Sequence, residues 1–170
     1  MEVLNCIETR RSIRAFETKP LTKEQLTILA EAARSAPTAR NMQTRRITVL
    51  QNKILMEKLR AAIQKELGRE NYTFYAPDAL IIASEKEDAI MPRENCACAL
   101  ENVFLAAHAM GIGSVWINQL NGVCDRPAIR EVLRELNLPN DHHVWGMAAV
   151  GYAAAPPRDI EKTGALEWVL

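Results

Sequence analysis

A short stretch near the start of the chain is rich in groups that bind phosphate: Arg10, Arg11, Ser12 and Arg14 lie within five residues. Arginine forms fork-shaped, charge-assisted hydrogen bonds that match the oxygens of a phosphate, and a serine hydroxyl can add another. A basic turn that faces solvent would have the same composition. From this cluster alone, both interpretations stay open: a phosphate site and a solvated turn.

A second candidate site is the segment 35–43, which is rich in small residues and contains Pro37 and Thr38. Its amide side chains, Asn41 and Gln43, can each donate and accept hydrogen bonds, which suits a heterocyclic edge or a row of hydroxyls. The segment joins an expected helix to an expected strand, so an ordinary helix-terminating loop would look the same. Taken alone, the ordinary loop is the simpler interpretation.

The glycines Gly111 and Gly113 come close to a dinucleotide-binding motif without completing it. Trp116 occupies the place of the third glycine, and the segment runs from a helix into a strand, the reverse of the order that the motif requires. A glycine that ends a helix and leads into a core strand explains the pattern. The sequence also lacks a Walker motif and a nucleophile elbow, so it assigns no catalytic side chain.

The sequence predicts no metal site. Cys96 and Cys98 are two residues apart on an expected helix, where their side chains diverge. His142 and His143 are adjacent just before an expected strand, so they would point to opposite faces. His108 falls on a largely apolar helix, where a hydrogen-bonded core or interface histidine is the usual outcome.

The composition predicts a single globular domain over residues 1–170, with 48% hydrophobic and 25% charged residues. The formal net charge is +0, so no overall field would attract nucleic acid or a membrane surface. No apolar run reaches the roughly 20 residues of a membrane-spanning helix, and the start carries no secretory signal pattern. We therefore expect a cytoplasmic protein whose cysteines are reduced.

Hydrophobic spacing and turn residues predict alternating helices and strands, as in an α/β or α+β domain. Thr22 with Gln25 matches a capping box that opens the second helix, and Gly68 is expected to end the third. The expected helices lie near 3–9, 22–36, 54–67, 96–110 and 127–136, and the expected strands near 47–50, 79–84, 115–117 and 144–150.

Two apolar segments predict a partner subunit. The helix 96–110 is apolar nearly all round, which indicates burial on most of its sides. In a chain of 170 residues, that burial points to a second copy as well as to the chain's own core. The irregular tail after Ala153 ends in Trp168, Val169 and Leu170, which we expect to pack on the partner.

Together these segments resemble the FMN-dependent nitroreductase family. The matching pieces follow the family's order along nearly the whole chain: Glu8–Phe16, Ser35–Pro37 with Asn41 and Gln43, Ala76–Pro77 before Leu80–Ile82, Cys98–Asn102, Gly111–Ile117, Gly151–Tyr152 and Lys162–Gly164. Each motif is weak alone, and five or more in this order are specific. The chain would be a short member, and Tyr75 stands where members often carry asparagine.

The resemblance implies an α+β fold with a central, mostly antiparallel sheet flanked by helices. It also implies an intertwined homodimer with FMN at the subunit interface. The arginine stretch (10–14) would hold the phosphate and pyrimidine edge of FMN, and the small-residue loop (35–43) would reach it from the other subunit. The implied cofactor-binding residues are Arg10, Arg11, Ser12, Arg14, Pro37, Thr38, Asn41, Gln43, Ser114, Trp116 and Lys162.

The implied activity is a ping-pong oxidoreductase reaction. NADH or NADPH would reduce the flavin at N5, and a small electron-poor acceptor such as a nitroaromatic or a quinone would reoxidise it. In such enzymes the cofactor carries the chemistry, and the protein binds and orients it. Two alternatives remain: a flavin reductase or another flavin-binding or flavin-processing protein of the same fold, and a non-enzymatic module that only dimerises.

Overall fold

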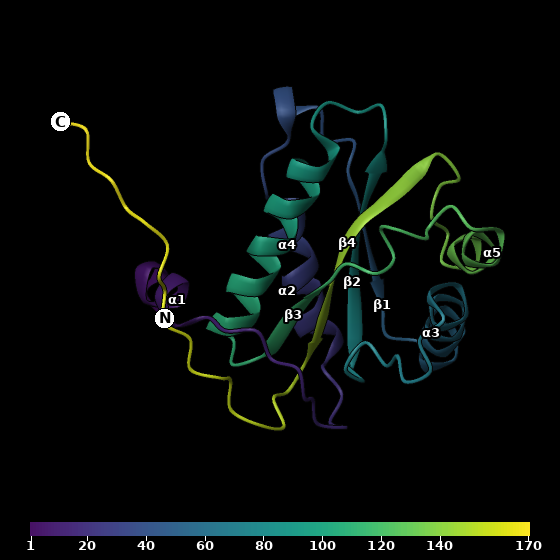
Figure 1. The fold of residues 1–170 in the computed structure, drawn as a ribbon, viewed down its shortest axis with the longest axis horizontal. Coiled ribbons are helices and arrows are strands. Elements are labelled where there is room, and N and C mark those ends of the chain that lie inside the picture. The colour runs from purple at the N-terminus through teal and green to yellow at the C-terminus, as the bar shows by residue number, and fades with distance from the viewer.

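A four-stranded sheet forms the middle of the computed structural model, which describes residues 1–170 (Figure 1). Its strands are β1 (Arg46–Leu50), β2 (Ala79–Lys86), β3 (Gly113–Ile117) and β4 (His142–Gly151), in the order β1-β2-β4-β3. Every neighbouring pair is antiparallel. The expected α+β class and the central antiparallel sheet are confirmed.

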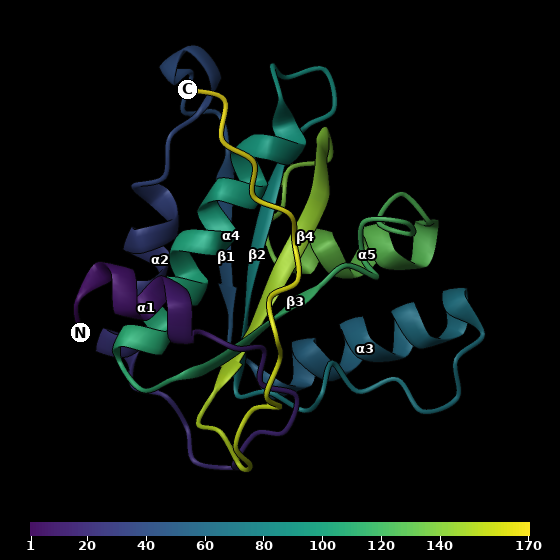
Figure 2. The ribbon, with the colours of Figure 1, turned by 60° about the vertical axis from the view of Figure 1, so that its left-hand side comes forward.

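Helices cover both faces of this sheet. They are α1 (Val3–Thr9), α2 (Lys23–Arg34), α3 (Lys53–Leu67), α4 (Pro92–Ala109) and α5 (Pro127–Glu135), with one short 3-10 turn, η1 (Ala39–Asn41). α2 and α4 lie on one face, α3 and α5 on the other, and α1 rests against α4 outside these layers (Figures 1 and 2). α4 therefore packs against both the sheet and α1.

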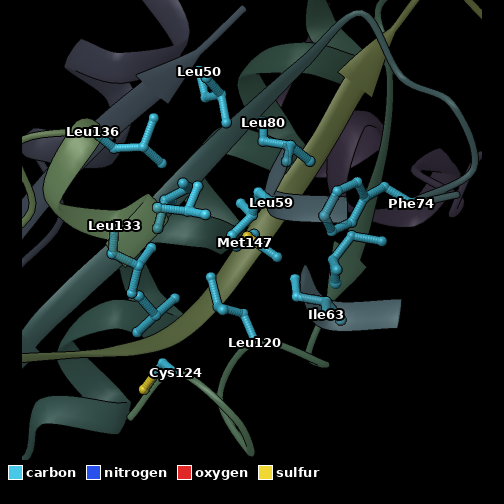
Figure 3. Packing of buried hydrophobic residues seen from close by; sticks show 14 of the residues in the cluster. Leu50, Leu59, Ile63, Phe74, Leu80, Leu120, Cys124, Leu133, Leu136 and Met147 are labelled. Atoms are coloured by element: carbon cyan, nitrogen blue, oxygen red, sulfur yellow. The ribbon is translucent and has the colours of Figure 1, made fainter. Parts of the chain in front are cut away.

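Alternation along β2 divides the core between the two faces. Leu80 and Ile82 join the cluster under α3 and α5, whereas Ile81 and Ala83 join the cluster under α2 and α4. Figure 3 shows the first cluster, with Leu80 among side chains from both of its helices and from β4. Because each fully buried Leu or Ile side chain contributes about 1.5–3 kcal/mol, this two-sided burial favours an inner position for β2, beside the other inner strand β4.

Local signals set several helix ends as the sequence predicts. At the start of α2, the Thr22 hydroxyl accepts the Gln25 N–H at 3.2 Å, and the Gln25 side chain accepts the Thr22 N–H at 2.9 Å. This reciprocal pair is the expected capping box. Gly68 follows α3 with φ of 61°, a left-handed conformation that glycine adopts without strain.

Two boundaries differ from expectation. α4 begins at Pro92, where a proline at the first helical position lacks only an N–H that would have had no partner. β4 begins at His142, so His142 and His143 lie within the strand and are buried, not in a loop before it. Every residue of β4 is buried, so no polar alternation marks where the strand starts.

Several apolar side chains have no cover within this chain. On α1, Cys6 is buried, but Val3, Leu4 and Ile7 are more than half exposed. α4, expected to be buried on most sides, leaves one side open at Cys98 and Glu101. The tail after Tyr152 is exposed throughout and extends away from the body of the chain (Figure 1). None of the helices combines the length and apolarity that crossing a bilayer requires.

Candidate functional site

The arginine stretch is docked on the outer strand of the sheet. Ser12 forms a parallel bridge with Ser114, and the Ile13 N–H donates to the Ser114 carbonyl at 2.9 Å. Gly113 permits this approach, because a Cβ there would lie 2.9 Å from Ile13 Cγ2. Residues about a hundred positions apart in the sequence, Ser12 and Ser114, are thereby brought together as the resemblance implies.

The three arginines of the stretch have different roles. Arg10 lies above the Phe104 ring on α4, with its Nε 3.6 Å from a Glu101 carboxylate oxygen. Arg11 turns back and donates to the carbonyls of Glu8 and Arg10, at 2.6 and 2.9 Å, so it braces the end of α1. Arg14 is exposed and forms no ion pair within the chain. Of the three, Arg14 has the guanidinium that is free for a ligand.

A pocket of about 500 Å³ opens beside Arg14. Ser12–Ala15 form one side of it, and Ala155–Ile160 of the tail form the other. The two segments are held together because the Ala154 N–H donates to the Ala15 carbonyl at 3.0 Å. Arg158 is therefore a second cation at this pocket, which sequence reasoning missed, while the predicted Lys162 lies further along the exposed tail and does not line it.

An aromatic surface lies next to the docked stretch. Trp116 on β3 is 37% exposed, and its ring lies 6.2 Å from that of Phe104, centroid to centroid. Gly146 on β4 makes room for the indole, since a Cβ there would lie 2.5 Å from Trp116 Cζ2. The indole N–H donates to the Asn118 side chain at 3.3 Å. A partly exposed, fixed indole can stack against a planar ring.

Electrostatics around the arginine stretch are positive. A hydrogen bond of 2.8 Å joins the His108 Nε2 atom of α4 to the hydroxyl of Thr9, which directly precedes the arginine stretch. Burial lowers the pKa of His108, and the charges of Arg10 and Arg11 lower it further. His108 is therefore kept neutral at physiological pH and adds no charge, while the nearby guanidinium groups favour an anion.

The small-residue loop forms a separate site. Pro37, Thr38, Asn41 and Gln43 line a pocket of about 920 Å³. The Gln43 N–H donates to the Thr38 hydroxyl, and the Gln43 amide donates to the Asn41 side chain, both at 3.0 Å. Asn41 and Gln43 both have φ of 53°, and Arg40 has 52°, left-handed values that are unfavourable outside glycine. Backbone held in this way is typical of ligand-binding loops.

A buried polar network holds this loop in place. Arg45 donates to the carbonyls of Asn95 and Ala33, at 2.7 and 2.9 Å. The Asn95 side chain accepts the Ala39 N–H at 2.8 Å and donates to the buried Glu85 carboxylate at 2.9 Å. Sequence reasoning missed these three positioning side chains. The sequence gives no signal for them, because Asn95 and Glu85 both adjoin other polar residues, Arg93-Glu94 and Lys86-Glu87-Asp88.

The two halves of the candidate site lie at different ends of α4. Asn95, near its start, contacts the small-residue loop, and His108, near its end, contacts α1. These residues are thirteen positions apart, which at 1.5 Å per residue is about 20 Å along the helix. One chain therefore brings together Arg10, Ser12, Ser114 and Trp116, but it does not bring the small-residue loop to them.

Comparison with known proteins matches this fold and these segments. The family model named Nitroreductase family matches residues 7–152. A protein of Archaeoglobus fulgidus, provisionally named NADH dehydrogenase/NAD(P)H nitroreductase, is 31% identical over 89% of this chain and 85% of its own length. An NADPH-dependent oxidoreductase of Staphylococcus aureus is 27% identical over 96% of this chain and 68% of its own length.

Solved structures agree with the sequence comparison. The crystal structure of a nitroreductase with bound FMN from Bacteroides fragilis superposes with a TM-score of 0.92, at 34% identity over 100% of both chains. A nitroreductase from Desulfitobacterium hafniense, at 23% identity over 100% of both chains and a TM-score of 0.88, shares the fold. The family match spans the arginine stretch, the small-residue loop and all four strands. The chain belongs to the nitroreductase family.

Proposed function

We propose that the chain is an FMN-dependent oxidoreductase that uses NADH or NADPH, with the arginine stretch as the grip for the FMN phosphate. The observation that carries the proposal is the pocket beside Arg14. It joins a guanidinium without a partner, the Ser12 segment and Arg158 at a place where the stretch is fixed on β3. The FMN bound to the Bacteroides fragilis relative supports the same cofactor here.

The donor groups fit a flavin phosphate. Phosphate oxygens accept hydrogen bonds only, and the pocket offers three donors, Arg14, Arg158 and the Ser12 hydroxyl, against one carboxylate, Asp159. Trp116 offers a flat apolar face nearby, as a planar ring system requires. Ser114 is buried on β3, so we assign it to docking the Ser12 segment rather than to cofactor contact.

When bound, FMN would supply the redox chemistry between a nicotinamide and an acceptor such as a nitroaromatic or a quinone. The chain's own part is to bind and orient. Arg14 and Arg158 neutralise the phosphate, and the loop amides Asn41 and Gln43 supply hydrogen bonds that fit a heterocyclic edge. The chain shows no buried acid poised beside Trp116, so the proton for the acceptor comes from solvent through the open pocket.

A homodimer completes this site. The small-residue loop lies about 20 Å along α4 from the arginine stretch, so the second copy delivers its own loop to the first copy's phosphate grip. Two uncovered apolar surfaces support the pairing: the outer side of α1 and the end of the tail. Exposed apolar surface of this extent is typical of a subunit interface.

Arg14→Ala tests the phosphate grip. The variant loses a charge-assisted bond worth about 1.5–3 kcal/mol, so we expect FMN to bind about 10-fold to 100-fold more weakly. Arg69→Ala, which also removes an exposed arginine but lies after α3, is the matched control and should bind FMN as the wild type does. Titration of the flavin-free protein with FMN measures both. Equal affinity in the Arg14 variant and the control would reject the assignment.

Turnover assays then test the proposed oxidoreductase activity. The flavin-loaded wild type should oxidise NADH or NADPH and reduce a quinone or a nitroaromatic, with parallel lines in double-reciprocal plots as a ping-pong reaction gives. A protein that binds FMN tightly yet oxidises neither nicotinamide would be a flavin-binding protein, and the proposed activity would be wrong.

A further inference from the structure

Three potential metal ligands converge at a place that the proposed flavin site does not use. Cys124 and Asp125 lie in the loop after β3, His143 lies in β4, and a carboxylate beside them, Glu87, lies in the turn after β2. The His143 Nδ1 atom is 3.1 Å from Cys124 Sγ, 3.2 Å from Asp125 Oδ2 and 3.2 Å from Glu87 Oε1. A thiol, an imidazole and the Asp125 carboxylate thus lie within reach of one ion, and Glu87 approaches the imidazole from a third segment.

Neighbouring groups orient two of these ligands. The other ring nitrogen of His143, Nε2, lies 2.9 Å from the Asn121 side-chain oxygen, which can only accept, so Nε2 carries the hydrogen. In the neutral ring, Nδ1 then offers its lone pair to the cluster. Arg130 holds the Oδ1 atom of Asp125, which leaves Oδ2 directed at His143 and Cys124. A hydrogen bond that fixes the far side of a ligand is typical of metal sites.

The distances among the ligand atoms suit a small tetrahedral ion. Bonds of roughly 2.0–2.3 Å to zinc place neighbouring ligand atoms about 3.3–3.6 Å apart. Here Asp125 Oδ2 lies 3.7 Å from Cys124 Sγ and 3.2 Å from His143 Nδ1, and the ligand atoms of Cys124, Asp125 and His143 all lie within 4.8 Å of one another. Hydrogen bonding alone serves this arrangement poorly, because a neutral ring whose hydrogen is on Nε2 has no Nδ1 hydrogen to donate to the two carboxylates.

The cluster is open to solvent on its polar side. A pocket of about 380 Å³ is lined by Glu87, Asp125 and His143 and by further polar residues only. His143 is the buried ligand that lines it, Cys124 lies buried beside His143 outside the lining, and the carboxylates of Glu87 and Asp125 are exposed. An ion can therefore enter from water and meet the carboxylates first.

We propose that Cys124, Asp125 and His143 bind one zinc ion, with the Glu87 carboxylate close to His143. On binding, the Cys124 thiol gives its proton to solvent and becomes a thiolate ligand, while His143 binds through Nδ1. Three protein ligands leave one position for a water molecule, and the ion ties the loop after β3 to β4. The site revises the sequence prediction of no metal, which examined neighbouring cysteines and histidines and not residues from separate segments. It does not depend on the proposed flavin chemistry.

The test uses the full chain with FMN bound, freed of metal by a chelator and titrated with Zn²⁺ or with Co²⁺ as a spectroscopic substitute. We expect one ion per chain, with Co²⁺ bands of tetrahedral intensity at wavelengths beyond the flavin absorption. Cys124→Ser should lose the sulfur-to-cobalt band, and Cys98→Ser, which alters an exposed cysteine outside the cluster, should keep it.

Two surface variants keep the test valid if Cys124→Ser folds poorly. Asp125→Asn alters an exposed ligand, and we expect it to weaken Zn²⁺ binding by at least about 10-fold. Glu87→Gln removes an exposed charge beside His143 and should weaken Zn²⁺ binding less. Zn²⁺ should raise the thermal unfolding midpoint of the wild type more than that of either variant. Binding of no Zn²⁺ by the wild type, or equal binding by wild type and both variants, would overturn the proposal.

Discussion

Gly113 positions the candidate site because it has no side chain. With no side chain there, Ile13 packs directly on the start of β3, and the neighbouring Ser12 and Arg14 are held at the pocket. Gly122, in the loop after β3, has nothing within 4 Å of the position that a Cβ would take. Alanine variants at the two glycines can therefore distinguish a steric clash at Gly113 from the general effect of adding a methyl group.

Gly113→Ala should lower both the free energy of unfolding and the affinity for FMN. The added Cβ would lie 2.9 Å from Ile13 Cγ2 and 3.0 Å from Ile13 Cβ, too close for a side chain whose own position is fixed by burial. Overpacking of this kind costs about 1–3 kcal/mol. Urea unfolding and FMN titration measure the two effects, and Gly122→Ala should change neither by more than about 0.5 kcal/mol. Equal results for both variants would contradict the steric account.

At the scale of elements, Asp78 joins three segments at the start of β2. Its carboxylate accepts the Leu21 N–H and the Gln51 amide, both at 2.8 Å, and the Lys53 ammonium at 2.9 Å. Burial alone would raise the pKa of Asp78, but these hydrogen bonds outweigh it and hold the pKa below its ordinary value. The ionised carboxylate therefore fixes the connection between the arginine stretch and α2.

Asp78→Asn should lower the free energy of unfolding by about 2 kcal/mol at pH 7, mostly through the buried hydrogen bonds, because Lys53 is exposed and its ion pair adds little. A lowered folded-state pKa gives stability that is complete above the unfolded-state pKa and is lost as pH falls through the folded-state value. The gap between wild type and variant should therefore close below about pH 4. Urea unfolding across pH checks this, and a constant gap down to pH 2 would refute it.

The elements were largely predictable from sequence, and the reasons are local. The capping box at Thr22 and the glycine after α3 act within a few residues, so they can be read directly. The start of β4 was missed because burial on both faces removes alternation. The small-residue loop was found by its composition, but its support by Arg45, Asn95 and Glu85 was not, since these partners lie up to fifty positions apart and meet only in the fold.

The candidate site was likewise predictable only where its residues can be recognised without long-range contacts. Arg10, Ser12 and Trp116 were found because their types and the family resemblance point to a flavin, and the structure brings them together. Lys162 was predicted from the tail whereas Arg158 lines the pocket, because only the pairing of the tail with Ala15 shows which basic residue lies beside the arginine stretch. Where a contact depends on long-range pairing, composition identifies the segment and not the residue.

At the scale of the whole molecule, the tail tests the pairing of two chains. Trp168 and Leu170 are exposed in one chain, and buried aromatic anchors commonly dominate an interface. Replacing both by Ser should weaken dimerisation at least about 10-fold, measured by sedimentation at several concentrations. Ile54→Ser, on the opposite side of the molecule in α3, removes an equally exposed apolar side chain and should leave dimerisation unchanged. A wild type that stays monomeric with FMN bound would refute the pairing.

Because the two halves of the site are separated along α4, dimers formed from two different variant chains should behave differently from dimers of either variant alone. In the proposed pair, each chain gives its arginine stretch to one flavin and its small-residue loop to the other. A chain altered only at Arg14 and a chain altered only at Asn41 therefore place both defects at one flavin when they associate. The second flavin then contacts only unaltered residues. The dimer of the two different variants therefore regains one active flavin site, which neither variant forms as a homodimer.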